Sequence, residues 1–245
     1  MLTTTRKSPH HIHFSWKSFG KIAAYSILFF AFIFSIAKLR NSEYFPIHNV
    51  QVVGVQHISH QEIQEKVMPF VNNGFFSVDV DRIKEQIMQI PWVQHVFVRR
   101  IWPNKVLITV DEKVPLAIWN DSSLLSAAGE LFSPATKTYP NDLPVLIGQQ
   151  GEQILMTQYY AKMSEVLLPL HYKITKLELS PAMAWTITLE NGIKLNIGHK
   201  DVLTRLVHFV KVYPKIVGER VADVEYIDLR YPNGMAVRWK QSHNI

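Results

Sequence analysis

The chain of 245 residues contains no cysteine, which excludes a disulfide framework and catalysis by a thiolate. It also lacks the GxGxxG, Walker, GxSxG and HExxH patterns of common nucleotide-binding and catalytic sites. Two SxxK patterns occur, but they flank a hydrophobic run and no KTG follows them, so we attribute them to chance. We therefore predict that the chain is not an enzyme and has no catalytic residue, cofactor or small-molecule substrate.

Metal sites are not predicted either, although histidines lie close together in two places. His10, His11 and His13 fall in a polar N-terminal tail, where an unstructured segment is the simpler explanation. His57 and His60 could supply two ligands, but no third ligand is nearby in the sequence. A surface loop before a helix explains this second pair better.

Acidic residues are missing from the first 21 positions, which hold four basic residues, Arg6, Lys7, Lys17 and Lys21. The formal net charge of the chain is +6, from 26 basic and 20 acidic residues. Without the four N-terminal charges, 22 basic and 20 acidic residues remain, a balance typical of an ordinary solvated surface. A nucleic-acid partner, which would need a basic patch, is therefore not predicted.

A run of sixteen uncharged residues, Ile22–Ala37, lies between Lys21 and Lys38. As a helix it would be about 24 Å long. This length is slightly less than the roughly 30 Å hydrocarbon core of a bilayer, and the flanking lysines can reach the interface. We predict a transmembrane helix over residues 22–38 and, from the basic excess before it, a cytoplasmic tail over residues 1–21. The rest of the chain would then lie across the membrane.

A cleaved signal peptide is the alternative explanation of this run, because Ser35-Ile36-Ala37 fits a small-x-small cleavage site. Two features favour an uncleaved anchor instead. The 21 residues before the run are long for a signal peptide, and five of the sixteen residues within it are aromatic.

Residues 45–113 have the pattern of a small α+β domain. A capping box, Ser59 with Glu62 three residues later, predicts the start of one helix, and Asp79 is the expected N-cap of a second. Strands are predicted over residues 50–55, 93–101 and 105–111. The order strand, helix, helix, strand, strand predicts two helices on one face of a three-stranded sheet.

Residues 114–245 predict a second domain, a mixed β-sheet with flanking helices. Strands are expected over residues 116–119, 124–126, 145–147, 174–179, 185–189, 193–197, 224–231 and 235–239, and helices over residues 152–168 and 199–217. Asn191-Gly192 predicts a type I′ hairpin turn, in which both central residues have positive φ angles. The fold class expected for the whole chain is therefore α+β.

Three segments resemble one known family. Residues 91–106, PWVQHVFVRRIWPNKV, resemble the PW…WP pattern of POTRA domains in the version of the FtsQ/DivIB family of bacterial division proteins. Residues 112–119, EKVPLAIW, are similar to the ExxPxAxW pattern that follows in the family. Residues 226–239, YIDLRYPNGMAVRW, resemble its closing DLRY…W pattern. With the basic tail and the single span, the resemblance covers nearly the whole chain.

The resemblance implies a single-pass inner-membrane protein that is concentrated at the division septum. Its N-terminus would lie in the cytoplasm, and a POTRA domain and a C-terminal β domain would lie in the periplasm. Members of the family are non-enzymatic scaffolds of the divisome that bind FtsB and FtsL and connect these with other division proteins.

The resemblance also implies where FtsB binds, namely at the edge of the last strand, which a partner segment can extend. The residues that carry over are Arg230, Tyr231, Asn233, Gly234, Met235, Ala236, Val237, Arg238 and Trp239. Tyr231 is the expected anchor, because tyrosine is common among interface hot spots. Trp239 is better explained by packing on the last helix.

Two departures from the family pattern bear on this interface. Many members carry a basic pair before the hairpin tryptophan, where this chain has Met183-Ala184. Pro232 lacks a backbone donor, so strand pairing is expected to start only after Gly234. The alternative function is that of another POTRA-containing protein, a polypeptide-binding factor in secretion or outer-membrane assembly.

Overall fold

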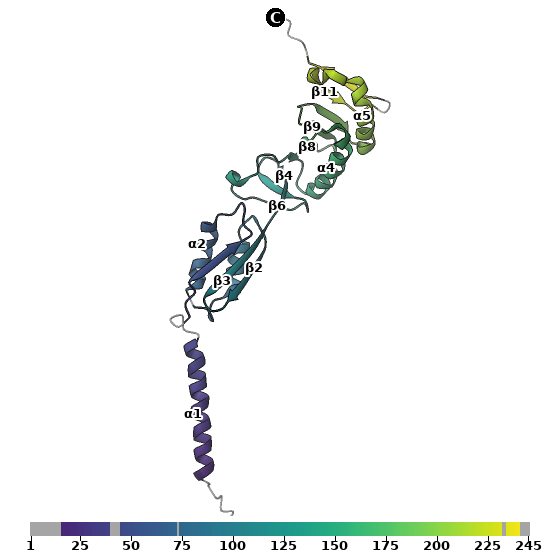
Figure 1. Cartoon of the computed structure of the whole chain (residues 1–245). Helices are drawn as coiled ribbons and strands as arrows, with labels where there is room; N and C mark the ends of the chain where they lie inside the picture. The colour runs from purple at the N-terminus through teal and green to yellow at the C-terminus, as the bar shows by residue number, and fades with distance from the viewer. Residues whose placement is uncertain (1–15, 40–44, 73, 232–233, 241–245) are drawn as a thin grey trace, which may run out of the picture. The chain divides into compact units, whose positions relative to one another are not determined.

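The computed structural model describes residues 16–39, 45–72, 74–231 and 234–240 (Figure 1). Most of the predicted cytoplasmic tail therefore lies outside the described residues, as does Asn233 of the predicted interface. The chain divides into two compact units. The first unit comprises residues up to 53, 61–86 and 97–109, and the second comprises residues 54–60, 87–96 and 110–245.

The N-terminal helix, α1, spans Trp16–Leu39 and contains the uncharged run. Its described apolar side chains are exposed, among them Phe29, Phe30 and Phe32 at 61–69%. Tested over the part of the chain that the structure describes, no helix reaches the length and apolarity of a membrane crossing.

The small α+β pattern is confirmed in its order of elements and its sheet. The elements are β1 (Asn49–Val53), α2 (His60–Val71), α3 (Val80–Met88), β2 (Val93–Ile101) and β3 (Lys105–Glu112). The sheet has the order β1-β3-β2, and β1 runs parallel to β3. The predicted cap of α3 is also confirmed, because the backbone N–H of Arg82 donates to Asp79 Oδ1 at 3.1 Å.

The second unit contains a nine-stranded mixed sheet of order β12-β11-β10-β9-β8-β7-β4-β5-β6. Its strands are β4 (Pro115–Trp119), β5 (Ser123–Ser126), β6 (Leu131–Phe132), β7 (Val145–Ile147), β8 (Ile174–Leu179), β9 (Trp185–Leu189), β10 (Lys194–Gly198), β11 (Val224–Asp228) and β12 (Ala236–Trp239). Short 3₁₀ segments are η1 (Thr136–Thr138), η2 (Leu168–Leu170) and η3 (Gly218–Asp223). The expected mixed sheet is confirmed.

Two long helices connect parallel neighbours in this sheet. Helix α4 (Gln153–Leu167) joins β7 to β8, and α5 (Val202–Ile216) joins β10 to β11. Crossovers of this kind are right-handed almost without exception, so both helices come to the same face of the sheet. Figure 1 shows them next to each other beside the strands.

The register of the sheet places one row of apolar residues against these helices. The row runs from β4 to β12 through Trp119, Leu146, Leu177, Ile187, Leu195, Ile227 and Val237. All seven belong to one core cluster with Met163 of α4 and Phe209 of α5, or pack against it. The next row, on the opposite side of the pleat, is Lys176, Thr188, Lys194, Tyr226 and Arg238. The period of two along each strand therefore separates core from solvent.

Two local predictions are wrong. Only Gly192 has a positive φ in the β9–β10 turn, at 83°, so the turn is not type I′. Asn191 instead accepts the N–H of Ile193 through its side chain at 3.1 Å, which holds the turn in another geometry. Strand β11 ends at Asp228 and not at Tyr231, because the side chain of Asp228 captures the backbone N–H of Arg230 at 3.0 Å.

Candidate protein-binding edge

Strand β12 forms one edge of the nine-stranded sheet. It pairs with β11 along one side, in the antiparallel register Ile227↔Val237. Over the described residues, no strand pairs with its other side. Such an edge presents backbone donors and acceptors on which another chain can add a strand. The opposite edge of the sheet, β6, is only two residues long.

The three-stranded sheet also ends in a long edge strand, the nine-residue β2. Near its C-terminal end, β2 carries Arg99 and Arg100, and both are exposed. Charged side chains on an edge discourage pairing with a further strand. Compared with the two-residue β6 and with β2, which carries two exposed arginines, β12 carries only one and is the better candidate for strand addition.

The side chains of β12 alternate between solvent and core. Ala236 and Arg238 are exposed, whereas Val237 and Trp239 are half-buried and pack against the core cluster. The guanidinium of Arg220, in η3, lies 4.2 Å from the centre of the Trp239 ring. Trp239 thus packs against the core cluster, and Arg220 of η3 covers its ring.

Arg238 is held on the outer side of the β11–β12 pair. Its Nε lies 3.1 Å from Glu225 Oε2, and its guanidinium lies 5.7 Å from the centre of the Tyr226 ring. Both side chains of this ion pair are at least half exposed. Since exposed ion pairs contribute little to stability, Arg238 can exchange Glu225 for a carboxylate of another chain.

Tyr231 is 57% exposed, just before the two residues that the structure does not describe. It lines a cavity of about 450 Å³ at the N-terminal half of α5. The other lining residues are Asp201, Thr204, Arg205, His208, Phe209, Leu229, Gly234 and Met235. The structure therefore brings three of the predicted residues, Tyr231, Gly234 and Met235, around one concave surface next to β12.

A buried carboxylate fixes the backbone before Tyr231. Asp228, 6% exposed, accepts hydrogen bonds from the backbone N–H, Nε and Nη2 of Arg230 at 2.7–3.1 Å. The hydrogen bonds from Arg230 hold the pKa of the Asp228 carboxyl below its usual value, although burial opposes this. Arg230 is thus occupied within the chain, and its predicted contact with a partner would have to use its remaining exposed surface.

The neighbouring residue Gly198 is required at the end of β10. Its φ is +82°, and a Cβ there would lie 3.2 Å from Arg230 Cγ and 3.3 Å from Arg205 Nη1. Arg205 in turn donates through Nη1 to the carbonyl of Ile197 at 2.8 Å. Sequence reasoning missed Asp228, Arg205 and Gly198. Only Asp228 had a signal, as part of the DLRY pattern.

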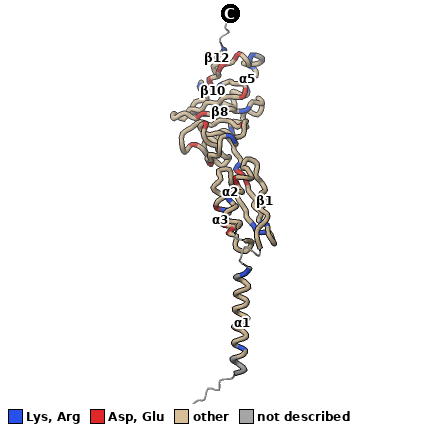
Figure 2. The backbone as a smooth tube through the Cα atoms, turned by 90° about the vertical axis from the view of Figure 1, so that its left-hand side faces the viewer, with Lys and Arg blue, Asp and Glu red and all other residues tan. Residues whose placement is uncertain are grey.

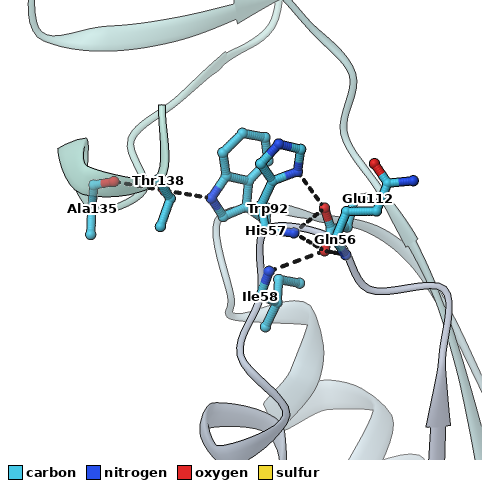
Figure 3. A network of polar contacts seen from close by, with 7 residues as sticks. All are labelled: Gln56, His57, Ile58, Trp92, Glu112, Ala135 and Thr138. Carbon is cyan, nitrogen blue, oxygen red and sulfur yellow. Dashed lines mark hydrogen bonds and ion pairs between the residues drawn. The ribbon is translucent and has the colours of Figure 1, made fainter. Parts of the chain in front are cut away.

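A second polar network lies at the start of the second unit (Figure 3). Glu112 accepts the backbone N–H groups of Gln56, His57 and Ile58 at 2.8–3.2 Å. Its Oε2 also lies 2.8 Å from His57 Nδ1. Burial raises the pKa of Glu112, but the hydrogen bonds from these groups outweigh burial and lower it below its usual value.

Trp92 extends this network to η1. Its ring stacks on His57 with 4.2 Å between centroids, and its Nε1–H donates to Thr138 Oγ1 at 2.9 Å. Thr138 donates in turn to the carbonyl of Ala135 at 2.7 Å. His57 lies in the predicted loop, but its ring is part of the packing and only 30% exposed. The network holds loop 54–59 against Trp92 and Glu112 within the second unit, and its role is structural.

Over the described residues, no group of three or more histidine, aspartate or glutamate side chains is arranged to bind a metal ion.

Met183, where the resemblance implies a basic residue, has a positive φ of 59° and is 45% exposed. The buried Trp185 beside it stacks on Tyr159, with 4.6 Å between ring centroids.

Comparison with known proteins gives two family matches. Residues 45–113 match the FtsQ-type POTRA domain, and residues 117–230 match the C-terminal domain of cell division protein FtsQ/DivIB. Tyr231 and β12 lie just beyond the second match. The cell division protein FtsQ of Coxiella burnetii is 34% identical over 232 residues, which are 93% of this chain and 96% of that protein.

Two further relatives have the same name. Cell division protein FtsQ of Burkholderia pseudomallei is 33% identical over 79% of this chain and 80% of its own length. The Escherichia coli protein is also 33% identical, over 82% of this chain and 75% of its own length. These matches cover both units, so the chain belongs to the FtsQ/DivIB family of cell-division proteins.

Proposed function

We propose that this chain is a non-enzymatic scaffold of the divisome and that it binds FtsB through the free edge of β12. FtsL and other division proteins would join the same assembly during septum formation. The observation that carries this proposal is that, over the described residues, one side of β12 pairs with no strand and Tyr231 nearby is exposed. Membership of a cell-division family supports it.

The added segment of FtsB would be a tenth strand of the sheet. Main-chain hydrogen bonds would give affinity, and the alternation of side chains would select the register. An apolar residue is expected opposite Val237, because Val237 continues the core row of the sheet. An acidic residue is expected opposite or next to Arg238, whose exposed guanidinium already pairs with Glu225.

Tyr231 is proposed as the anchor of this interface. Its ring is more than half exposed, and it does not pack against the core cluster as Met235, Val237 and Trp239 do. A large exposed aromatic ring beside a concave surface can bury much apolar area on binding. Hot-spot residues of this kind cost about 2 kcal/mol or more when truncated.

The test is the affinity of the full chain for FtsB, measured for Tyr231→Ala and for a control. Tyr231→Ala is expected to weaken binding by about 30-fold, the equivalent of 2 kcal/mol. The matched control is Leu168→Ala in η2, which removes another apolar side chain that is 66% exposed. Its affinity should stay within about twofold of the original. Unchanged affinity for Tyr231→Ala would refute the assignment.

We further propose that α1 holds the chain in the inner membrane, with its N-terminus in the cytoplasm and the two domains in the periplasm. The uncharged run Ile22–Ala37 and the exposed phenylalanines of α1 support the anchor. The four basic residues before the run, with no acid among the first 21 residues, support the orientation. Alkaline carbonate washing of membranes should leave the full chain in the pellet, and a fluorescent fusion should concentrate at septa. Release by carbonate would contradict the anchor.

The rival function, a polypeptide-binding factor in secretion or outer-membrane assembly, predicts different partners. Affinity purification of the full chain from membranes distinguishes the two. Recovery of FtsB and FtsL supports the scaffold, whereas recovery of outer-membrane proteins without them favours the rival.

A further inference from the structure

An exposed tryptophan lies at the turn between β2 and β3. Trp102 is 70% exposed, and its neighbour Ile101 is 37% exposed. Arg99 and Arg100 precede them, and both are exposed. A large apolar ring left in water beside cations is unusual in a packed domain and indicates a surface that meets another phase or molecule.

This turn lies beside the residues where the chain enters the first unit. Asn104 accepts the backbone N–H groups of His48 and Asn49 at 3.0 and 3.3 Å. Only five residues separate Phe45 from Leu39, the last residue of α1. A stretch of this length spans at most about 20 Å, so the turn cannot be far from the end of α1.

Further aromatic rings border the same end of the unit. The backbone N–H of Phe75 donates to the carbonyl of Phe45 at 2.8 Å. The rings of Phe45 and Phe76 lie 5.3 Å apart, edge to face, and Phe76 is 44% exposed. Arg100 reaches the carbonyl of Phe76 through Nη1 at 3.5 Å, which ties the hairpin to these rings.

Among the described residues of this end, the charges are of one sign. Residues 45–53, 72–78 and 97–109 contain Arg99, Arg100 and Lys105 but no Asp or Glu. The nearest following acid, Asp79, caps α3 and lies 3.4 Å from Arg82. Figure 2 colours Lys and Arg blue and Asp and Glu red along the backbone, and the acids of the first unit include Glu62 of α2 and Asp81 of α3. The surface therefore complements an anionic partner.

We propose that the β2–β3 turn, residues 101–105, rests on the anionic lipid headgroups of the bilayer that holds α1. Tryptophan and arginine together are typical of the membrane interface, and each cation near an anionic surface strengthens attachment about fivefold. The short connection to α1 keeps the turn close to this surface. The inference rests on the proposed membrane anchor and adds a second, reversible contact with the same membrane.

The test uses the absence of cysteine from the chain. Asn104→Cys, at the exposed turn, and Gln64→Cys, at the exposed N-terminal half of α2, each give one site for a spin label. The full labelled chain is reconstituted into vesicles of phosphatidylcholine alone or of phosphatidylcholine with phosphatidylglycerol. Relaxation by oxygen and by a water-soluble nickel chelate then reports whether each label lies in lipid or in water.

The label at position 104 is expected to be protected from nickel in vesicles with phosphatidylglycerol and more accessible without it. The label at position 64 should be accessible to nickel in both. Arg100→Gln should lower the ratio of docked to undocked molecules about fivefold. Trp102→Ser should lower this ratio further. Phe97→Ser, which removes a ring that is 61% exposed and lies five residues before Trp102, should not change it.

The outcomes separate docking from anchoring. If the chain stays in the vesicles but the label at position 104 is as accessible to nickel as that at position 64, docking is refuted and the anchor stands. If the chain leaves the vesicles under alkaline carbonate, both proposals fail. Circular dichroism melting of each variant checks folding, and unchanged melting is expected because Trp102 and Phe97 lie outside the core.

Discussion

Glu112 is the residue whose replacement should most clearly weaken the start of the second unit. Its side chain is only 8% exposed and accepts from three consecutive backbone N–H groups. A single carboxylate therefore satisfies three consecutive donors of loop 54–59. Glu112→Gln keeps the shape and volume of the side chain and removes its charge.

The expected loss follows from the hydrogen bonds. Bonds to a charged acceptor contribute about 1.5–3 kcal/mol, against about 0.5–1.5 kcal/mol for neutral pairs. In the original chain, the N–H of His57 donates to both carboxylate oxygens of Glu112 at 3.0 Å. In the variant, one of these oxygens is replaced by an amide NH₂ group, which is a donor and would face the N–H of His57. We expect the free energy of unfolding to fall by about 2–3 kcal/mol at neutral pH.

The pH dependence of stability gives an independent check. The folded-state pKa of Glu112 lies below its ordinary 4.5, because the hydrogen bonds of loop 54–59 outweigh burial. Its contribution is therefore complete above pH 4.5 and is lost as the pH falls through the lower folded pKa. Glu112→Gln should lack this part of the acid destabilisation, so its stability curve should be flatter below pH 4.5.

Urea unfolding of the full chain in detergent, followed by circular dichroism, measures both effects. The control is Glu165→Gln, an exposed carboxylate on α4, which should change stability by less than about 0.5 kcal/mol. If Glu112→Gln unfolds at the same urea concentration as the original chain, or if the two acid profiles coincide, the assigned role of the carboxylate is wrong.

Two further replacements test the support of the β12 edge. Asp228→Asn should lower stability by about 2 kcal/mol, because the bonds from Arg230 lose their charged acceptor. The hydrogen bonds from Arg230 hold the pKa of Asp228 below 3.8, so the original chain should lose this contribution as the pH falls through the lowered value, and the variant should not. Gly198→Ala should cost about 1–2 kcal/mol for its positive φ and more for its contacts with Arg230 and Arg205. Gly192 also has a positive φ, +83°, but an added Cβ there would meet no atom within 4 Å, so Gly192→Ala should show the conformational cost alone. Equal thermal unfolding of Gly198→Ala and Gly192→Ala would exclude a cost from the contacts with Arg230 and Arg205.

Local pattern was enough to predict much of the fold. β2 and β9 were predicted with their observed ends, because apolar residues alternate within bounds set by proline, glycine and polar turns. The cap at Asp79 was predictable for the same reason, since only neighbouring residues take part.

The order of strands in the large sheet could not be predicted in this way. β7 pairs with β4 and β8, although 25 residues separate its start from the end of β4. Such pairings depend on the apolar row that the strands share and on the crossover helices between them. These features join residues far apart in the sequence, so a short segment does not reveal them. The type of the β9–β10 turn was also mispredicted, because the side chain of Asn191 bonds the backbone there.

The candidate edge was predicted from family resemblance and not from pattern. Alternation alone would give β12 no special role among nine strands. Its support was missed because Gly198, Arg205 and Asp228 come from β10, α5 and β11 and meet only in the folded unit. The role of Glu112 was likewise hidden, since its donors lie more than 50 residues earlier.

The length of the large sheet has a mechanical consequence. β12 is six strand spacings from β4, or about 29 Å, and the twist of the sheet over this distance is about 130°. A partner strand on β12 would therefore be held at a wide angle to β4. Because the hydrogen bonds run across the strands, a pull along β12 loads them together, whereas a pull away from the sheet breaks them one after another. The edge resists force best along its own strand direction.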